Sequence, residues 1–386
     1  MIRRPSGALS GRRAGVRLGR CGRRGFERHL VVAMSASVFP CFAPDFSPAR
    51  PVRVGTRGSP LARQQTQLVV SSLSATWPGF RWSEEVIATA GDRVADRHLS
   101  EVGGKGLFAK EIDAALLAGR LDLAVHSLKD LETKLPAGIV LACTLPRADP
   151  RDALVIDPRY LFDERRIAFP MLPASARIGT ASARRRAQLL HARPDLRIGL
   201  IRGNVQTRLN RLEDGDYVAT LLAVAGLERL GLISRLDVSG EMRRIQRLRC
   251  GPGIVVLAPE TMVPAAAQGI IAVTARADDR RTLSLLAAIN DRATWAAARA
   301  ERAVLRALDG NCRTPIGAYA RMLPNRELLL TAMTARADGS FLIKRWRRGQ
   351  AVEADALGAE LGASLRRISP EDLFDEPPAA SAGAES

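Results

Sequence analysis

Short apolar runs alternate with helical patterns along most of this chain, and this alternation constrains its fold more than any other feature. Short stretches rich in apolar residues occur at 121–126 and 138–143, whereas 60–73 and 107–117 place apolar residues at helical spacing. Short runs bounded by turn residues predict buried strands, and the helical spacing predicts amphipathic helices. The repeated order of strand, turn and helix therefore predicts α/β domains, with ligands bound at the carboxyl ends of the strands.

The same order restarts in the middle of the chain and changes near its C-terminus. Strands are predicted at 177–179, 196–201 and 217–223, with helices at 184–192 and 205–213. Further on, the pattern predicts a helix at 294–308, strands at 317–322, 328–334 and 341–344, and a helix at 354–366. The C-terminal part is therefore expected to form a smaller α+β unit.

Length and charge bound the number of domains and the kind of partner. A chain of 386 residues exceeds what one hydrophobic core usually supports, so two or three domains are expected. Basic residues number 58 against 40 acidic ones, and all but five of them are arginine. Because the guanidinium fork matches carboxylate and phosphate oxygens, this excess indicates an anionic partner.

Residues 1–49 differ in composition from the rest of the chain. They are rich in Arg, Gly, Ser and Pro, and the first 28 hold nine arginines and one acid, Glu27. This composition predicts disorder. Three explanations stay open: an arginine-rich transit peptide, a nucleic-acid-binding arm, or an upstream extension of a coding sequence that begins at Met34.

The sequence predicts neither a membrane span nor a disulfide framework. No run of about 18 apolar residues occurs, so no helix is expected to cross a bilayer. Cysteines stand at 21, 41, 143, 250 and 312, an odd number without the spacing of a zinc site. We therefore expect no bound metal and a reducing, cytoplasmic location.

Two arginine clusters occur where a predicted strand gives way to a predicted helix, at 179–185 and 202–208. A hydroxyl or amide side chain caps such a helix, and the free amides at its start attract anions. Arginines beside them would complete an anion cradle, and a solvated helix start is the alternative interpretation. The cradle residues are expected to be Thr180, Ser182, Arg184, Arg185, Arg202, Asn204 and Arg208.

The segment Gly103-Gly104-Lys105-Gly106-Leu107-Phe108 places three glycines around one lysine. It lacks the spacing of a phosphate-binding P-loop, so nucleotide binding by that route is not expected. The glycines favour a loop that closes over a ligand, with Lys105 as a charge contact and Phe108 as an aromatic surface. A flexible loop without a binding role is the alternative.

Asp130 ends the segment His126-Ser127-Leu128-Lys129-Asp130, which follows a predicted strand. We expect its carboxylate at the carboxyl end of that strand, in the usual position of a binding crevice. There it could stabilise a developing cation or move a proton, whereas capping a loop or pairing with Lys129 is the structural alternative. A Ser/His/Asp triad is not expected, because residues crowded into one short stretch do not converge.

Cys312 lies in the glycine-bounded segment 309–317 between a predicted helix and a predicted strand. An exposed thiol beside Arg313 has its thiolate favoured and can act as a nucleophile. Cys143 and Cys250, by contrast, read as a buried thiol and a loop thiol.

Eight segments, in their order along the chain, resemble the porphobilinogen deaminase family. They are residues 56–62, 103–108, 125–130, 179–185, 200–205, 222–227, 267–269 and 311–317. The likeness runs from about residue 52 to residue 320, and several segments are individually specific. The C-terminal third matches more loosely.

The resemblance implies three domains. Two are α/β domains similar to type II periplasmic binding proteins and hinged about a cleft, and the third is a small C-terminal α+β domain. The implied boundaries are 50–147 with 262–280 for domain 1, 148–261 for domain 2 and 281–370 for domain 3. Residues 1–49 and 371–386 are expected to be a disordered extension and tail.

The resemblance also implies a transferase that joins four porphobilinogen molecules head to tail, with release of ammonia, to give hydroxymethylbilane. Cys312 would carry a dipyrromethane cofactor as a thioether, and Asp130 would stabilise cationic pyrroles and handle protons. The cofactor would be held by Arg57, Ser59, Lys129, Thr180, Ser182, Arg184, Arg185, Arg202, Asn204 and Arg208. Gln65, Lys105, Phe108 and Arg229 would contact the substrate and the growing chain. A monomer without nucleic-acid or membrane partners is expected.

Parts of the sequence depart from the family pattern. The stretch 239–258 is longer than usual, and Ala267 stands where a glycine is expected.

Two other functions compete with this one. A non-catalytic anion-binding or solute-binding protein on the same hinged fold would have no use for Cys312 or Asp130. Nucleic-acid binding is weaker still, because aromatic residues make up only 4% of the chain and form no stacking array.

Overall fold

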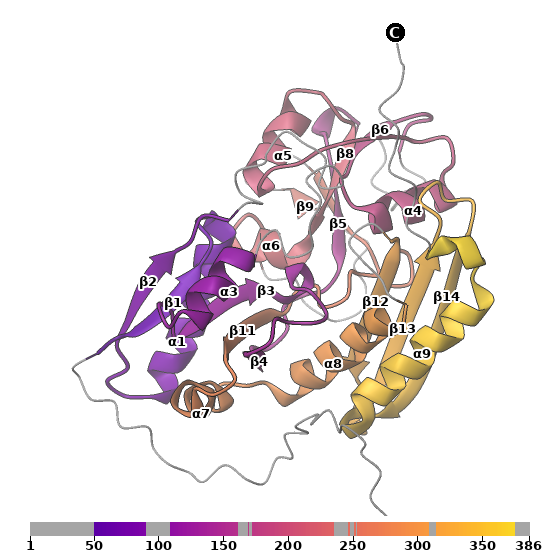
Figure 1. Cartoon of the computed structure of the whole chain (residues 1–386). Helices are drawn as coiled ribbons and strands as arrows, with labels where there is room; N and C mark the ends of the chain where they lie inside the picture. The colour runs from indigo at the N-terminus through magenta and orange to yellow at the C-terminus, as the bar shows by residue number, and fades with distance from the viewer. Residues whose placement is uncertain are drawn as a thin grey trace, which may run out of the picture. The chain divides into compact units, whose positions relative to one another are not determined.

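The fold is taken from a computed structural model. It describes residues 50–89, 109–160, 169, 172–234, 246–247, 251, 253–308 and 314–374. Three sheets and the helices that cover them make up this part of the chain (Figure 1). No described helix is long and apolar enough to cross a membrane.

The first sheet has the strand order β2-β1-β3-β11-β4. Its strands are β1 (Val52–Thr56), β2 (Trp82–Val86), β3 (Leu123–Ser127), β4 (Ile139–Thr144) and β11 (Ile271–Arg276). Strand β11 runs antiparallel to both β3 and β4, whereas β1 pairs in parallel with β2 and β3. Its helices are α1 (Pro60–Thr76), α3 (Lys110–Leu117) and α7 (Arg280–Ala287). The expected helix and strands of this region are confirmed.

The second sheet has the strand order β7-β6-β8-β5-β10-β9. Its strands are β5 (Asp152–Ile156), β6 (Arg177–Gly179), β7 (Arg197–Gly199), β8 (Ala219–Ala223), β9 (Gln246–Arg247) and β10 (Gly253–Val256). Its helices are α4 (Ala183–Ala192), α5 (Val205–Glu213) and α6 (Val224–Arg229). Strand β5 is a correction, because the sequence pattern predicted no strand between 151 and 177.

Each of these two sheets contains one strand that the chain forms directly after crossing over from the other sheet. The chain passes from β4 to β5 and returns from β10 to β11, and β5 and β11 are the strands that run antiparallel to their inner neighbours β8 and β3. A double crossover of this kind is the arrangement of the type II periplasmic-binding-protein fold, as the resemblance implied. It places the carboxyl ends of β1, β3, β6 and β7 on the side where ligands bind.

The third sheet is a meander of β12 (Ile316–Met322), β13 (Glu327–Ala335) and β14 (Leu342–Gln350). Helices α8 (Arg292–Ala307) and α9 (Ala354–Ile368) lie side by side against it (Figure 1). Gly358 makes this close approach possible, because a Cβ there would lie 2.2 Å from the carbonyl oxygen of Ala300. The expected α+β unit is confirmed, although β14 extends six residues past the predicted end at 344.

Glu301 on α8 connects this unit to the first sheet. Its side chain is fully buried and lies 2.5 Å from the Nη1 atom of Arg147, three residues after the end of β4. The same carboxylate accepts hydrogen bonds from the backbone N–H groups of Ala267 and Ala320. One buried acid therefore joins three segments that are far apart in the sequence.

Candidate active site

The turn after β3 carries the two charged residues that the sequence singled out. Strand β3 ends at Ser127, and a short 3-10 helix, η1 (Leu128–Asp130), follows it. Lys129 and Asp130 are exposed, whereas Leu128 and Leu131 on either side are buried. The expected placement of Asp130 at the carboxyl end of a strand is confirmed.

The residues that follow β1 meet residues of α1, β3 and η1 in a cavity of about 70 Å³. Arg57 and Ser59 follow the carboxyl end of β1, and Asp130 reaches the same cavity from the end of β3. Ser59 also caps α1, since its hydroxyl accepts a hydrogen bond from the N–H of Ala62. Gln65, buried on α1, completes the set and hydrogen bonds to Ser127 at 2.8 Å. Four of the predicted site residues are thus brought together.

His126 lies beneath this cavity and is neutral. Burial, together with the charge of Arg57, lowers the pKa of His126 to about 4. Its Nε2 atom lies 3.0 Å from the hydroxyl of Thr274 on β11. A histidine held neutral at physiological pH and tied to a buried hydroxyl is a packing group, which removes it from the candidates for proton transfer.

The second half of the site lies at the starts of α4 and α5. Ser182 caps α4 by accepting a hydrogen bond from the N–H of Arg185, and Thr180 accepts one from the N–H of Ser182. Asn204 caps α5 with a 2.9 Å bond from the N–H of Thr207. Gly203 before it has a φ of +97°, a conformation that favours glycine. Of the two candidates predicted to cap α4, Thr180 and Ser182, the cap is Ser182, whereas Asn204 was predicted only as a turn residue.

Arg184 and Arg185 have a counter-ion that the sequence did not reveal. Both are buried, and the fully buried carboxylate of Asp152 lies 2.8 Å from Nη1 of Arg184 and 2.7 Å from Nη2 of Arg185. Arg185 also donates to the carbonyl of Leu221, and Arg184 to that of Val263. The interpretation of these two arginines as solvated residues at a helix start is therefore wrong.

Asp152 was not predicted as part of the site, because the strand that it opens was missed although 153–156 is a short apolar run. Burial alone would raise its pKa, but the charges of Arg184 and Arg185 hold the pKa well below its usual range. The carboxylate therefore stays ionised and fixes both guanidinium groups in place.

Gln268 connects the two halves of the site. Its Nε2 atom donates to Oδ1 of Asp152 at 3.1 Å and to the carbonyl of Pro150 at 2.7 Å, and its Oε1 atom lies 3.4 Å from Nζ of Lys129. The side chain is fully buried. Gln268 belongs to the segment 267–269 that the family resemblance singled out. That segment pointed to a functional position, but no role was predicted for Gln268.

Burial, with a smaller contribution from neighbouring positive charges, lowers the pKa values of Lys129 and Arg208. The surrounding protein lowers the pKa of Lys129 to about 8 by limiting its hydration, and Arg185 and Arg184 add to this against the opposing charges of Asp130 and Asp152. Burial lowers the pKa of Arg208 to about 10, with a further contribution from Arg185. Depressed pKa values on neighbouring cations indicate a site built for an anion.

The charges of the described residues fit an oligocarboxylate ligand. Seven charged side chains interact electrostatically around Lys129 and Arg208. Five are basic and two are acidic: Lys129, Arg184, Arg185, Arg202, Arg208, Asp130 and Asp152. This excess of positive charge suits a ligand that carries several carboxylates.

Arg229, at the end of α6, lies between the two α/β parts. It donates from Nη2 to the carbonyl oxygen of Gly269 at 2.7 Å, and burial lowers its pKa to about 10. Three other predicted site residues, Lys105, Phe108 and Cys312, lie outside the described residues.

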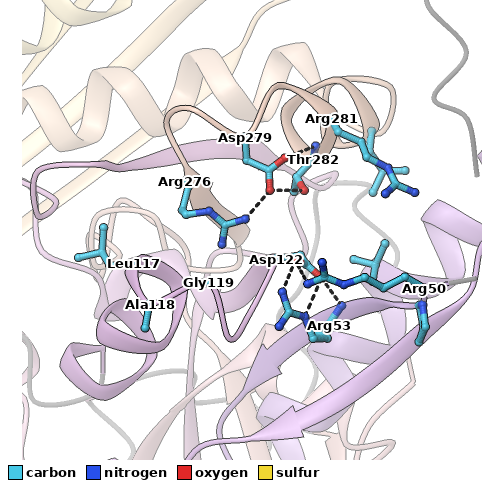
Figure 2. A pocket seen from close by; sticks show the side chains of 13 residues that line it. Arg50, Arg53, Leu117, Ala118, Gly119, Asp122, Arg276, Asp279, Arg281 and Thr282 are labelled. Carbon is cyan, nitrogen blue, oxygen red and sulfur yellow. Dashed lines mark hydrogen bonds and ion pairs between the residues drawn. The ribbon is translucent and has the colours of Figure 1, made fainter.

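A larger cavity of about 470 Å³ lies at the opposite edge of the first sheet, beside the start of β1. Figure 2 shows that its charged residues pair with one another: Arg53 binds Asp122, and Arg276 binds Asp279. None of the predicted site residues lines it. Arg53 and Arg276 are occupied by structural ion pairs, so cavity size does not identify the site here.

Two family models match this chain. The dipyromethane cofactor binding domain of porphobilinogen deaminase matches residues 52–284, and the porphobilinogen deaminase C-terminal domain matches residues 295–367. The porphobilinogen deaminase of Paracoccus denitrificans is 47% identical over 332 residues, covering 85% of this chain and 97% of that protein.

The porphobilinogen deaminase of Syntrophotalea carbinolica is 42% identical over 314 residues, covering 81% of this chain and 92% of that protein. The matches span both α/β parts and the C-terminal unit, and the charge of the site agrees with the cofactor that the first model names. The chain therefore belongs to the porphobilinogen deaminase family.

Proposed function

We propose that the cleft between the two α/β parts is where this chain condenses four porphobilinogen molecules head to tail, releasing ammonia, to give hydroxymethylbilane for haem and chlorophyll synthesis. The single observation that carries this assignment is the placement of Asp130, an exposed carboxylate, in one cavity with Arg57 and next to the positive charges of Lys129 and Arg208. An anion-binding protein without catalysis gains nothing from a carboxylate at that point, because it repels the ligand. A reaction that develops positive charge does gain from it.

Asp130 is proposed as the catalytic residue. Loss of ammonia from the aminomethyl group leaves positive charge on the pyrrole substrate, and a carboxylate oxygen of Asp130 lowers the energy of that charge. The same oxygen accepts the proton released when the new carbon–carbon bond forms. Its side chain opens into the 70 Å³ cavity beside Arg57, Ser59 and Gln65, which would orient the incoming substrate.

The dipyrromethane cofactor supplies the pyrrole end to which the first substrate is joined, and we propose that Cys312 holds it as a thioether. The cofactor carboxylates would be bound by the two capped helix starts and the basic residues around them. These residues are Arg57, Ser59, Lys129, Thr180, Ser182, Arg184, Arg185, Arg202, Asn204 and Arg208. Gln65, Lys105, Phe108 and Arg229 would contact the substrate and the growing chain.

Asp152 and Gln268 add a positioning function to this scheme. Because Asp152 fixes Arg184 and Arg185 before any ligand arrives, those guanidinium groups lose little freedom on binding.

We also propose domain boundaries at 50–147 with 262–280, 148–261 and 281–370, and a monomer that works in the cytoplasm.

The test of this function is the variant Asp130→Asn, which keeps the shape of the side chain and removes its charge. We expect the variant to carry the cofactor mass and to lose about 10²-fold to 10⁴-fold in kcat. Asp214→Asn is the matched control, since Asp214 is an exposed carboxylate at the end of α5. Near-normal turnover by Asp130→Asn would remove Asp130 from the mechanism.

A further inference from the structure

We infer that Arg302, on α8, is a positioning residue that holds the η1 turn and thereby sets the location of Asp130. The inference rests on the proposed function in one respect, namely that Asp130 is the catalytic carboxylate. Arg302 does not line the cavity at Asp130, so it acts through the backbone of the turn.

The η1 turn is held from below by apolar contacts with α8. Leu128 and Leu131, which flank Lys129 and Asp130, are buried in one cluster with Ala298 of α8. Because the flanking residues face α8, the two charged residues between them face outward. The direction of the Asp130 side chain therefore depends on how firmly the turn is seated on this helix.

Arg302 lies one turn of α8 beyond Ala298 and hydrogen bonds to the backbone that leaves η1. Its Nη2 atom donates to the carbonyl of Glu132 at 2.6 Å and to that of Thr133 at 3.0 Å, and its Nη1 atom lies 3.4 Å from the carbonyl of Leu131. Carbonyl oxygens at the end of a helical turn lack partners within the turn. One guanidinium thus donates hydrogen bonds to the backbone carbonyls of the three consecutive residues that follow Asp130.

The cost of burying this cation shows that the arrangement is specific. Arg302 is 7% exposed, and burial lowers its pKa to about 10, with a smaller contribution from the charge of Arg306. All its described hydrogen bonds go to carbonyl oxygens. A buried guanidinium that is compensated only by carbonyls is stable where all of them keep their positions, so the turn and the helix hold each other in register.

Helix α8 also connects the turn to the proposed tether. Glu301, the residue before Arg302, binds Arg147 and the backbone of Ala267. The helix ends at Ala307, and Cys312 follows five residues later in the sequence. Because the thiol and the carboxylate must stand at a defined separation for the reaction, a clamp from this helix to the η1 turn affects the catalytic geometry.

The experiment compares Arg302→Ala, Arg302→Lys and the control Arg299→Ala in the full chain carrying its cofactor. Arg299 lies on the same helix but pairs with Asp355 on α9, away from the turn. For Arg302→Ala we expect kcat to fall by about 10-fold to 100-fold with KM nearly unchanged, since a small displacement of a catalytic group has this effect. Added guanidinium ion should restore part of the lost kcat, which it would not do for a variant impaired by unfolding alone.

Amide hydrogen exchange at residues 129–134 gives a readout that does not depend on activity. It should speed up in Arg302→Ala and stay unchanged in Arg299→Ala. If Arg302→Ala does not fold, Arg302→Lys takes its place: one ammonium cannot serve three carbonyls, so faster exchange and a lower kcat are expected. Wild-type exchange and wild-type kcat in a folded Arg302 variant would overturn the inference, whereas full turnover by Asp130→Asn would overturn the proposed function and leave the exchange result standing.

Discussion

Asp152 and Arg185 form a buried ion pair, in which Oδ1 of the carboxylate lies 2.7 Å from Nη2 and 3.0 Å from Nε of the guanidinium. The other carboxylate oxygen binds Arg184 at 2.8 Å. A single acid at the start of β5 therefore holds in place two arginines at the start of α4. The positions of Arg184 and Arg185 thus depend on a residue in a sheet strand, 32 and 33 residues earlier in the sequence.

Replacing Asp152 by Asn should destabilise the fold strongly, because two buried guanidinium groups lose their counter-ion. Removing one partner of a buried charge pair typically costs about 3–5 kcal/mol, and urea denaturation at neutral pH measures it. Asp355→Asn is the control: Asp355 also binds two arginines, Arg299 and Arg306, but its side chain is 43% exposed. That variant should lose less than about 1 kcal/mol for each pair. Equal losses in both variants would contradict the account.

Lys129 should give the free enzyme a basic limb in its pH profile. Its pKa is lowered to about 8, so the ammonium loses its proton as the pH rises through that value. Loss of one positive charge weakens binding of a carboxylate substrate, and kcat/KM should therefore fall above about pH 8. Lys129→Arg keeps the charge at higher pH and should shift this limb upward. An identical limb in both proteins would assign it to another group.

Asp113 on α3 should make the fold less stable at neutral pH than in mild acid. Burial raises its pKa to about 6, with a smaller contribution from the charge of Glu132. Because the folded-state pKa is raised above the ordinary value, the penalty is absent below about pH 4 and complete above about pH 6.

Asp113→Asn removes that charge and should stabilise the protein at pH 8 by up to about 3 kcal/mol, with the gain vanishing towards pH 4. Glu132→Gln, which removes only the neighbouring charge, should recover a smaller part. Urea denaturation of the three proteins at both pH values measures these differences. A gain of equal size at both values would show that ionisation of Asp113 is not its source.

Local signals predicted the elements that position the site. Helices α4 and α5, and a cap at Thr180 or Ser182 for α4, were expected from neighbouring residues alone, and both helices begin within one residue of the prediction. The place of Asp130 at the end of a strand was also expected, because the apolar residues before it predict that strand from their immediate neighbours alone. Caps and apolar runs act over a few residues, so the sequence displays them directly.

The prediction missed strand β5 and the far end of β14. The apolar run at 153–156 was a usable local signal for β5, but the burial of the aspartate before it depends on an arginine 33 residues away along the chain. In β14 the basic residues after 344 resemble a loop, but they lie on an exposed strand where Arg347 pairs with Glu360 of α9. The ion pairs in both cases join distant segments, and a local pattern carries no information about such contacts.

The proposed covalent tether is the central claim, and the intact mass of the purified protein tests it most directly. The account predicts a mass greater than that of the polypeptide by two linked pyrrole units, and the loss of this excess in Cys312→Ser. Cys143→Ser, which changes a buried thiol in the first sheet, should keep the excess. An active protein whose mass equals that of the bare polypeptide would contradict the account.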